Sequence, residues 1–335
     1  MIEHGGRLRE AAAHYAIALH EWLDLSTGIN PRSWPVPALP MAAWARLPEE
    51  GDGLEEAARD YYGAPHVLPV AGSQAALQAL PRLRSPSRVG VLHPGYPEHG
   101  HCWGRAGHEV RLLRPEQMHP RSRPFDVLVL SNPNNPTGCR FELELLFEWH
   151  SRLAAGGGWL VVDEAYIDAT PGASLAPFSQ RPGLIVLRSL GKFFGLAGAR
   201  VGFVLAAPKL LSSLREQLGP WTVAGPSRWV AQQALEDRRW QADTRERLMH
   251  ASRRLVELLA RHGLKPSGNT ALFQWVRTRA ASTIQDALAR RGIWVRLFDD
   301  PASVRFGLPG SEGAWQRLEK ALAAVAETQT DAVSP

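Results

Sequence analysis

Short apolar runs alternate with amphipathic stretches from residue 41 to about residue 218. The clearest apolar runs, which we interpret as buried strands, are 88–92, 127–130, 159–162, 184–187 and 201–206. Between them, the apolar positions of 72–83 and 142–155 recur with the period of a helix. Continuous apolar strands joined by helices predict a mostly parallel sheet that is buried on both faces.

The pattern changes after Pro220. Pro220 and Pro226 bracket a break, and the stretch 228–262 then has the pattern of one long, arginine-rich helix. Strand-like apolar runs then follow at 271–276, 294–297 and 304–308. Helical periods occur at 283–291 and 313–326. We therefore expect an α/β protein with a large domain over 41–219 and a smaller α+β domain over 220–335.

Composition narrows the class of protein. The chain has 335 residues, of which 44% are hydrophobic, enough for a large core or for two unequal domains. The net charge is +5, but the arginines are spread along the chain and no nucleic-acid motif is present. This charge therefore suits a small anionic ligand better than a nucleic acid.

The number of cysteines and the hydropathy of the chain indicate the cellular compartment. Cys102 and Cys139 are the only cysteines, which excludes a disulfide framework and a four-cysteine zinc site and indicates a reducing environment. No apolar run approaches the roughly 20 residues of a membrane span, and the N-terminus lacks the apolar core of a signal peptide. We expect a soluble, cytoplasmic protein without a metal site or a membrane partner.

The segment 184–202 carries the strongest chemical pattern. Lys192 follows a predicted strand, with Ser189 three residues before it, Arg200 eight residues after it and glycines between them. A lysine amine that is held partly neutral condenses with an aldehyde. Ser189 and Arg200 can bind a phosphate through a hydrogen bond and a charge. The segment indicates an anionic cofactor bound to Lys192 through an imine.

Further polar groups follow the ends of the predicted strands. Asp163 and Tyr166 come directly after 159–162, and the loop 131–138, with three asparagines and two prolines, follows 127–130. Sites in open α/β sheets form beyond the carboxyl ends of strands, so these groups are expected at one site.

Two more pieces precede these motifs in the chain. The turn 71–74 begins a predicted helix, where backbone N–H groups can receive a phosphate. Tyr96 follows the strand 88–92, and His99 can share its face.

Along the chain these five motifs are the glycine turn, the aromatic residue, the asparagine-proline loop, the Asp163–Tyr166 pair and the Lys192 segment. In this order they resemble the motifs of class II aminotransferase-like enzymes of fold type I, which use pyridoxal 5'-phosphate (PLP). The resemblance implies that Lys192 holds PLP, that Asp163 faces the pyridine nitrogen and that Tyr166 acts on the ring 3-oxygen. These are the expected catalytic residues. The other expected cofactor contacts are Asn135 at the 3-oxygen, Tyr96 stacked on the ring, and Gly72, Ser73, Gln74, Ser189 and Arg200 at the phosphate.

The family also implies an assembly. Its members are homodimers with active sites at the subunit interface, and residues 1–40 would form an N-terminal arm that belongs to the small domain and to the active site. Many members have a tyrosine before a proline that reaches the partner's cofactor phosphate, but this chain has Leu47 before Pro48. Tyr61 or Tyr62 is a candidate substitute, or the phosphate has one contact fewer.

The ends of the chain bear on the reaction. His4-Gly5-Gly6 and the segment 24–31 resemble the opening of L-threonine-O-3-phosphate decarboxylases of cobalamin biosynthesis, relatives of histidinol-phosphate aminotransferases. Near the other end, Arg296 and Arg305 lie on or beside neighbouring predicted strands, and guanidinium groups bind carboxylate and phosphate bidentately.

The resemblance implies decarboxylation of O-phospho-L-threonine to (R)-1-amino-2-propanol phosphate, with Lys192 returning a proton to Cα. The residues expected to bind the substrate carboxylate and phosphate are His4, Asn30, Arg296 and Arg305. Two alternatives stay open: an aminotransferase for histidinol phosphate or another amino acid, and a non-catalytic PLP-fold binding module. The intact cofactor motifs count against the second and do not exclude the first.

Overall fold

The computed structural model describes residues 5–118 and 125–331. The chain divides into two compact units. The larger unit comprises Ser33–Asn135 and Cys139–Asp243, and the smaller unit contains the chain up to Arg32, the short segment Pro136–Gly138 and the chain from Thr244. The sequence break at Pro220 therefore lies within the larger unit, and the change of unit occurs inside a helix.

A seven-stranded sheet forms the centre of the larger unit, in the order β2-β8-β7-β6-β5-β3-β4. The strands from β3 to β7 pair in parallel, and only β2 and β8 run antiparallel to their neighbours. The strand bounds are β2 Leu68–Val70, β3 Arg88–Leu92, β4 Glu109–Leu113, β5 Val127–Ser131, β6 Trp159–Asp163, β7 Leu184–Ser189 and β8 Gly202–Leu205. The predicted mostly parallel sheet is confirmed.

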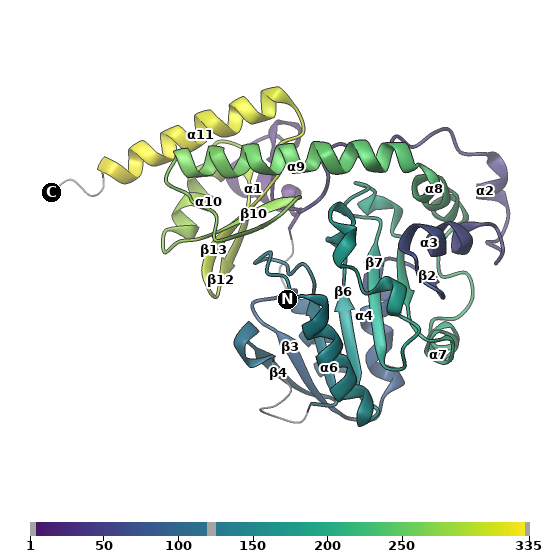
Figure 1. Ribbon diagram of the computed structural model, residues 1–335. Coiled ribbons are helices and arrows are strands. Elements are labelled where there is room, and N and C mark those ends of the chain that lie inside the picture. The colour runs from purple at the N-terminus through teal and green to yellow at the C-terminus, as the bar shows by residue number, and fades with distance from the viewer. Residues whose placement is uncertain (1–4, 119–124, 332–335) are drawn as a thin grey trace. The chain divides into compact units, whose positions relative to one another are not determined.

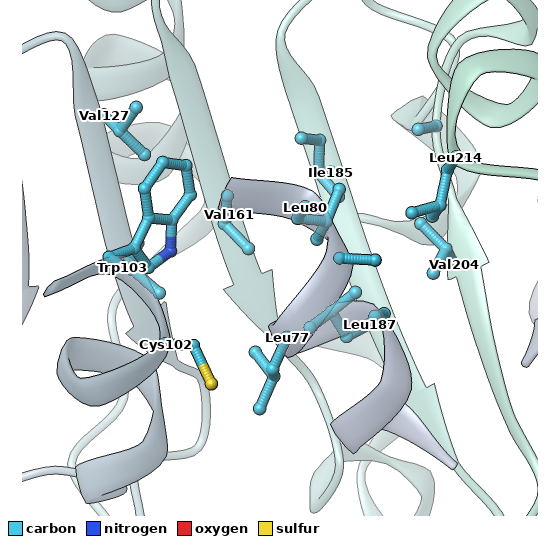
Figure 2. Packing of buried hydrophobic residues seen from close by; sticks show 14 of the residues in the cluster. Leu77, Leu80, Cys102, Trp103, Val127, Val161, Ile185, Leu187, Val204 and Leu214 are labelled. Carbon is cyan, nitrogen blue, oxygen red and sulfur yellow. The ribbon is translucent and has the colours of Figure 1, made fainter. Parts of the chain in front are cut away.

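Helices cover both faces of this sheet. Three of them, α4 (Ser73–Ala79), α5 (Pro97–Arg105) and α7 (Pro208–Leu218), pack on one face through a shared apolar cluster. Figure 2 shows part of this cluster, with Trp103 and Leu214 beside side chains of the strands. The remaining large helix, α6 (Leu143–Ala155), lies over the other face, in front of the strands in Figure 1.

Residue alternation in the strands explains why both faces are apolar. Val127 and Val129 of β5 belong to the cluster under α4, α5 and α7, whereas the equally buried Leu128 and Leu130 point to the opposite face. The same alternation holds in β6 and β7, so the strands read as continuous apolar runs.

The predicted helix over 72–83 is shorter than expected. It is α-helical only from Ser73 to Ala79 and continues as a 3-10 turn, Leu80–Leu83. Pro81 explains the change, because proline has no N–H to donate to the preceding turn.

The predicted single helix over 228–262 is wrong. Two helices replace it, α8 (Gly225–Glu236) and α9 (Arg238–Arg261), and Asp237 between them has a non-helical backbone (φ −77°, ψ 75°). The Asp237 carboxylate accepts hydrogen bonds from the backbone N–H of Trp240 and from the indole N–H of Trp34, both at 3.0 Å. The bond from Trp240 caps the first turn of α9, and the bond from Trp34 holds the capping carboxylate in place, which explains why a new helix begins there.

The smaller unit contains a four-stranded antiparallel sheet in the order β12-β13-β10-β9, and a separate parallel pair of β1 with β11. The bounds are β1 Leu23–Asp24, β9 Gly268–Thr270, β10 Phe273–Arg277, β11 Ile293–Trp294, β12 Arg296–Asp299 and β13 Ala302–Gly307. The predicted strand over 294–297 is thus two strands that belong to different sheets. The predicted α+β character holds.

Further helices complete the two units. Those of the smaller unit are α1 (Leu8–Tyr15), α10 (Ala281–Ala289) and α11 (Glu312–Asp331), and those of the larger unit are α2 (Met41–Ala45) and α3 (Leu54–Tyr62). None of the helices within the described ranges combines the length and the apolar character needed to cross a bilayer.

Candidate active site

The carboxyl ends of the parallel strands bring the predicted cofactor residues of the larger unit together. The register aligns Ser131 of β5 with Asp163 of β6, and Asp163 with Leu187 of β7. Alternation puts Asp163 and Ser189 on the same face of the sheet as Val161 and Leu187, the face covered by α4 and α5.

Asp163 is buried and held by two contacts. Its Oδ1 accepts a hydrogen bond from the backbone N–H of Ala165 at 3.0 Å, and its Oδ2 lies 3.0 Å from Nε2 of His99, which is also buried. The two contacts fix the plane of the carboxylate. A fixed, buried acidic group is suited to hold a proton on a pyridine nitrogen.

His99 is the clearest addition to the predicted site. The sequence analysis predicted that His99 shares a face with Tyr96, but it did not predict which residue His99 contacts. Both belong to the start of α5, where residues three apart are neighbours, and their rings meet edge to face at 5.4 Å. The contact with Asp163 joins residues 64 positions apart, so only the fold could reveal it.

Lys192 lies beside Tyr166. Its Nζ is 5.8 Å from the centre of the Tyr166 ring. The two residues after the lysine, Phe193 and Phe194, are buried and pack against Trp240. This apolar anchor fixes the backbone of the lysine, so that only its side chain has freedom to reach a ligand.

The predicted phosphate residues meet where three strands adjoin. Ser189 of β7 pairs with Gly202 of β8, and Gly202 pairs with Val70 of β2. Arg200 precedes β8 and Gly72 follows β2, so this register brings Arg200 and Gly72 together.

A Cβ on Gly72 would lie 2.7 Å from Nη2 of Arg200, which shows how closely the guanidinium covers this turn. Gly72 also has φ +72°, which favours glycine. Beside it, the hydroxyl of Ser189 accepts a hydrogen bond from the backbone N–H of Gly191 at 3.2 Å. A guanidinium, a hydroxyl and the first amides of α4 form a donor set suited to a phosphate.

A polar chain connects Tyr96 with the turn at α4. The hydroxyl of Tyr96 donates to Oε1 of Gln74 at 3.3 Å, and Nε2 of Gln74 donates to Oε2 of Glu98 at 2.9 Å. Burial, with the nearby Glu98 and Asp163, raises the pKa of Tyr96, so its phenol stays protonated. The side chain of Gln74 is therefore engaged with Tyr96 and Glu98, and its backbone N–H is the group suited to the phosphate.

The loop that carries Asn135 is held by its other asparagines. The side chain of Asn132 exchanges hydrogen bonds with the backbone of Phe141, and Nδ2 of Asn134 donates to the carbonyl of Pro94 at 2.8 Å. Pro94 lies two residues before Tyr96. The hydrogen bond from Asn134 therefore connects this loop to the segment that carries Tyr96.

Three of the four predicted substrate residues lie in described parts of the smaller unit. Arg296 of β12 and Arg305 of β13 are directly opposite each other in the antiparallel ladder. Arg305 is only 5% exposed; its Nη2 donates to the carbonyl of Ser26 at 2.7 Å, and its Cζ lies 5.0 Å from the centre of the Phe273 ring.

Asn30 is buried and its Oδ1 accepts a hydrogen bond from the backbone N–H of Arg32 at 3.0 Å. Ser26, which the sequence did not single out, organises the same segment: its hydroxyl donates to Asp24 at 2.6 Å and accepts from the N–H of Gly6 at 2.7 Å. His4 lies outside the described residues.

The position that departs from the family pattern is exposed. Leu47 is 64% exposed, and Tyr62, one suggested substitute for the missing tyrosine, is buried under the guanidinium of Arg188 at 4.3 Å. Tyr62 is therefore unable to reach another subunit. Tyr61 is only partly buried, with its ring 5.5 Å from that of Phe194.

The groups present fit PLP. The larger unit offers a buried carboxylate for the pyridine nitrogen, an amine beside a phenol, an aromatic ring, and a guanidinium with a hydroxyl for one phosphate. A larger residue at position 72 would collide with Arg200, so the open turn is a requirement of this arrangement.

Comparisons with known proteins agree with this reading. Residues 50–322 match the family described as "Aminotransferase class I and II". The threonine-phosphate decarboxylase of Pseudomonas aeruginosa is 59% identical over 96% of this chain and 97% of its own length. A threonine-phosphate decarboxylase of Sinorhizobium sp is 39% identical over 96% of this chain and 98% of its own.

Among solved structures, histidinol-phosphate aminotransferase from Sinorhizobium meliloti in complex with pyridoxal-5'-phosphate has a similar fold. Its TM-score is 0.83 at 21% identity, over 98% of this chain and 96% of that one. A family match over most of the chain, relatives that align along nearly its whole length and a shared fold lead to one conclusion. The chain belongs to the aminotransferase class I and II family.

Proposed function

We propose that this chain is a PLP-dependent decarboxylase that converts O-phospho-L-threonine to carbon dioxide and (R)-1-amino-2-propanol phosphate, a step of adenosylcobalamin biosynthesis. The observation that carries the proposal is the 59% identity with a threonine-phosphate decarboxylase along 96% of this chain. The opposed arginines of the smaller unit supply the charge that a substrate with both a carboxylate and a phosphate requires.

When bound, PLP supplies an electron sink for the electron pair left behind when a bond to the substrate Cα breaks. Asp163 holds the proton on the pyridine nitrogen, and His99 keeps its carboxylate oriented. Tyr166 would donate a hydrogen bond from its phenol to the ring 3-oxygen, and Asn135 would contact the same oxygen.

Lys192 has two tasks in this proposal. Its amine would hold the cofactor in the resting enzyme, and the same amine is the group that would return a proton to the substrate Cα. The buried Phe193 and Phe194 keep the backbone of the lysine in place during this exchange. Ser189, Arg200 and the turn at Gly72 hold the cofactor phosphate.

The substrate-binding residues select the bond that breaks. Arg305, fixed by its bond to Ser26 and stacked over Phe273, offers a rigid fork for one anionic group, and Arg296 offers a second guanidinium on the neighbouring strand. With Asn30 and His4 they bind the carboxylate and the phosphate. By fixing the orientation of the carboxylate, these residues would make the bond from Cα to the carboxyl carbon the one that breaks.

An aminotransferase would use the same cofactor residues, and the fold by itself does not separate the two reactions. The solved aminotransferase structure resembles this chain at 21% identity, which shows a common fold and no more. The identities of 59% and 39% are both to decarboxylases, and they favour carbon dioxide release over amino transfer.

The test is to incubate the purified enzyme and PLP with carboxyl-labelled O-phospho-L-threonine, with and without 2-oxoglutarate. We expect labelled carbon dioxide in both cases and no glutamate. Glutamate formation that depends on 2-oxoglutarate, without carbon dioxide, would show an aminotransferase. A Lys192→Ala variant is expected to lose both the product and the visible absorbance of bound PLP, and colourless wild-type protein would favour a binding module.

The resemblance further implies a homodimer in the cytoplasm, and we propose both for this chain. Surface apolar groups on and after α2 support the dimer: Met41 is 77% exposed and Trp44 66%. Apolar surface of this kind commonly marks a protein interface.

A further inference from the structure

A buried ionic cluster lies beside the proposed cofactor site and has no part in the mechanism above. We call it the Arg188 cluster; its members are Arg188, Glu164, Asp168 and Ser174. Nη1 of Arg188 donates to Glu164 and to Ser174, each at 3.1 Å, and Nη2 donates to Asp168 at 2.5 Å.

The cluster is closed off from solvent. Arg188 is 2% exposed, both carboxylates are fully buried, and the guanidinium lies on the face of the Tyr62 ring at 4.3 Å. Burial lowers the pKa of Arg188, but Asp168 and Glu164 more than offset this, so the guanidinium stays charged. A buried ion of this kind costs free energy unless its partners are well placed, and it is weak support for a purely stabilising role.

The members of the Arg188 cluster alternate in sequence with the proposed site residues. Arg188 directly precedes Ser189, and Glu164 directly follows Asp163. Because neighbours in extended chain point to opposite faces, Arg188 belongs to the α6 face of the sheet, whereas Ser189 belongs to the cofactor face. The cluster thus backs the strand ends that carry the site.

Tyr166 lies between the two carboxylates that Arg188 binds. Glu164 and Asp168 stand two residues before and two residues after Tyr166, and one guanidinium binds both. Glu164 is also tied on its other side, where its Oε1 accepts from the N–H of Leu175 at 2.7 Å and its Oε2 from the hydroxyl of Ser174 at 2.6 Å. The turn that carries the phenol is therefore held at both ends from one residue of β7.

We propose that Arg188 is a positioning residue that fixes the turn carrying Tyr166 relative to the end of β7, and so sets the phenol against Lys192. This inference rests on the proposed roles of Tyr166 and Lys192 toward PLP. Arg188 itself touches neither substrate nor cofactor in this proposal, and it acts through Glu164 and Asp168.

The experiment compares Arg188→Met with Arg228→Met. Arg228 is a matched control in the same unit, because it too is a buried arginine held by two carboxylates, Asp52 and Glu55, but neither flanks a site residue. Each apoprotein is examined for melting temperature, molecular mass and PLP dissociation constant, and each holoprotein for the pH midpoint of its absorbance change.

For Arg188→Met we expect PLP binding to weaken about ten-fold, as expected for the loss of one well-placed hydrogen bond from Tyr166. The pH midpoint rises, because a phenol that donates to the ring oxygen favours the deprotonated state of the bound cofactor. Arg188→Lys, which keeps the charge, restores part of both effects. Arg228→Met lowers the melting temperature without changing either PLP readout.

If Arg188→Met does not fold, Asp168→Asn gives the same readouts with the shape of the side chain preserved. Equal losses of melting temperature in the two arginine variants, with unchanged PLP affinity and unchanged midpoint, would overturn the proposal. Tyr166→Phe distinguishes the proposed role of Tyr166 toward PLP from the proposed positioning role of Arg188. If this variant leaves the pH midpoint unchanged, the role of Tyr166 is wrong. If it shifts the midpoint while the Arg188 variants do not, only the positioning role of Arg188 is wrong.

Discussion

At the residue scale, the opposed arginines place two positive charges side by side in the smaller unit. Arg296 and Arg305 face each other across β12 and β13, where like charges destabilise an antiparallel pair. The aromatic rings beside them, Phe273 and Phe298, offset part of this cost through cation–π contacts. A phosphate or carboxylate bound by these guanidiniums would offset the repulsion further, which suits the substrate we propose.

Arg305→Lys tests this reading. Lysine keeps the charge but loses the bidentate fork, and a hydrogen bond to a charged group contributes about 1.5–3 kcal/mol, so kcat/KM for O-phospho-L-threonine should fall about 10- to 100-fold. The loss should lie mainly in KM, with PLP absorbance unchanged. Arg277→Lys, at an exposed position of β10 paired with Ser303, is the control. Steady-state kinetics in which both variants match the wild type would contradict the assignment.

At the element scale, the contact between α3 and α8 depends on one arginine. Arg228 of α8 donates to both oxygens of Asp52, at 2.6 and 2.7 Å, and to Glu55 at 2.9 Å. Asp52 also accepts a hydrogen bond at 3.1 Å from the N–H of Leu54, the first residue of α3, whose N–H has no partner within the helix. Burial raises the pKa of Asp52, but the bonds from Arg228 and Leu54 outweigh it and hold the pKa below 3.8.

This depressed pKa makes the stability of the contact depend on pH. The stabilisation is fully present above 3.8, the value for the unfolded chain, and is lost as the pH falls through the lower pKa of the folded state. We expect Asp52→Asn to reduce the free energy of unfolding by about 1–3 kcal/mol at neutral pH, and the difference from wild type to shrink in strong acid.

Urea unfolding at neutral and acidic pH measures this difference. Glu56→Gln is the control, since Glu56 forms an exposed pair with Arg59 in the same helix and should change stability by less than about 1 kcal/mol. A difference between Asp52→Asn and wild type that is the same at both pH values would show that Asp52 does not titrate as described.

At the scale of the whole molecule, apolar surface on the larger unit predicts self-association. Met41, Trp44 and Leu47 lie close together in sequence and are all more than half exposed. Three large apolar side chains at this spacing are costly on a free surface. This segment includes Leu47, the position at which the family resemblance implies a contact with the partner subunit, so we expect it to form the dimer contact.

Trp44→Glu should therefore weaken the dimer. Burying a charge in place of a tryptophan at an interface costs about 2 kcal/mol or more, which raises the dimer dissociation constant about 30-fold or more. Light scattering across a dilution series measures the change. Leu112→Glu, an equally apolar exposed position on β4, should leave the mass unchanged. A monomeric wild type, or a Trp44→Glu variant that remains dimeric at every concentration, would contradict this interface.

Local pattern was sufficient for much of the fold. The strands of the central sheet are continuous apolar runs, and the bounds predicted for β3 and β5–β7 agree with the structure to within two residues, because strands buried on both faces have no polar positions to obscure them. The α8–α9 junction and the division of 294–297 were not predictable in this way. Asp237, between the two helices, is held by the indole N–H of Trp34, and residue periodicity does not report a partner about two hundred positions away.

The sequence by itself determined the chemistry available to this protein: one lysine after a strand, an aspartate and a tyrosine after another, and arginines near the end. Strand ends meet at one edge of a parallel sheet, so these residues could be assigned to a site before their distances were known. Only the tertiary structure decided which groups hold them. The contact of His99 with Asp163 and the Arg188 cluster join positions 64 and 20 residues apart, and the exact pairing of Arg296 with Arg305 depends on strand register, which no local pattern reports.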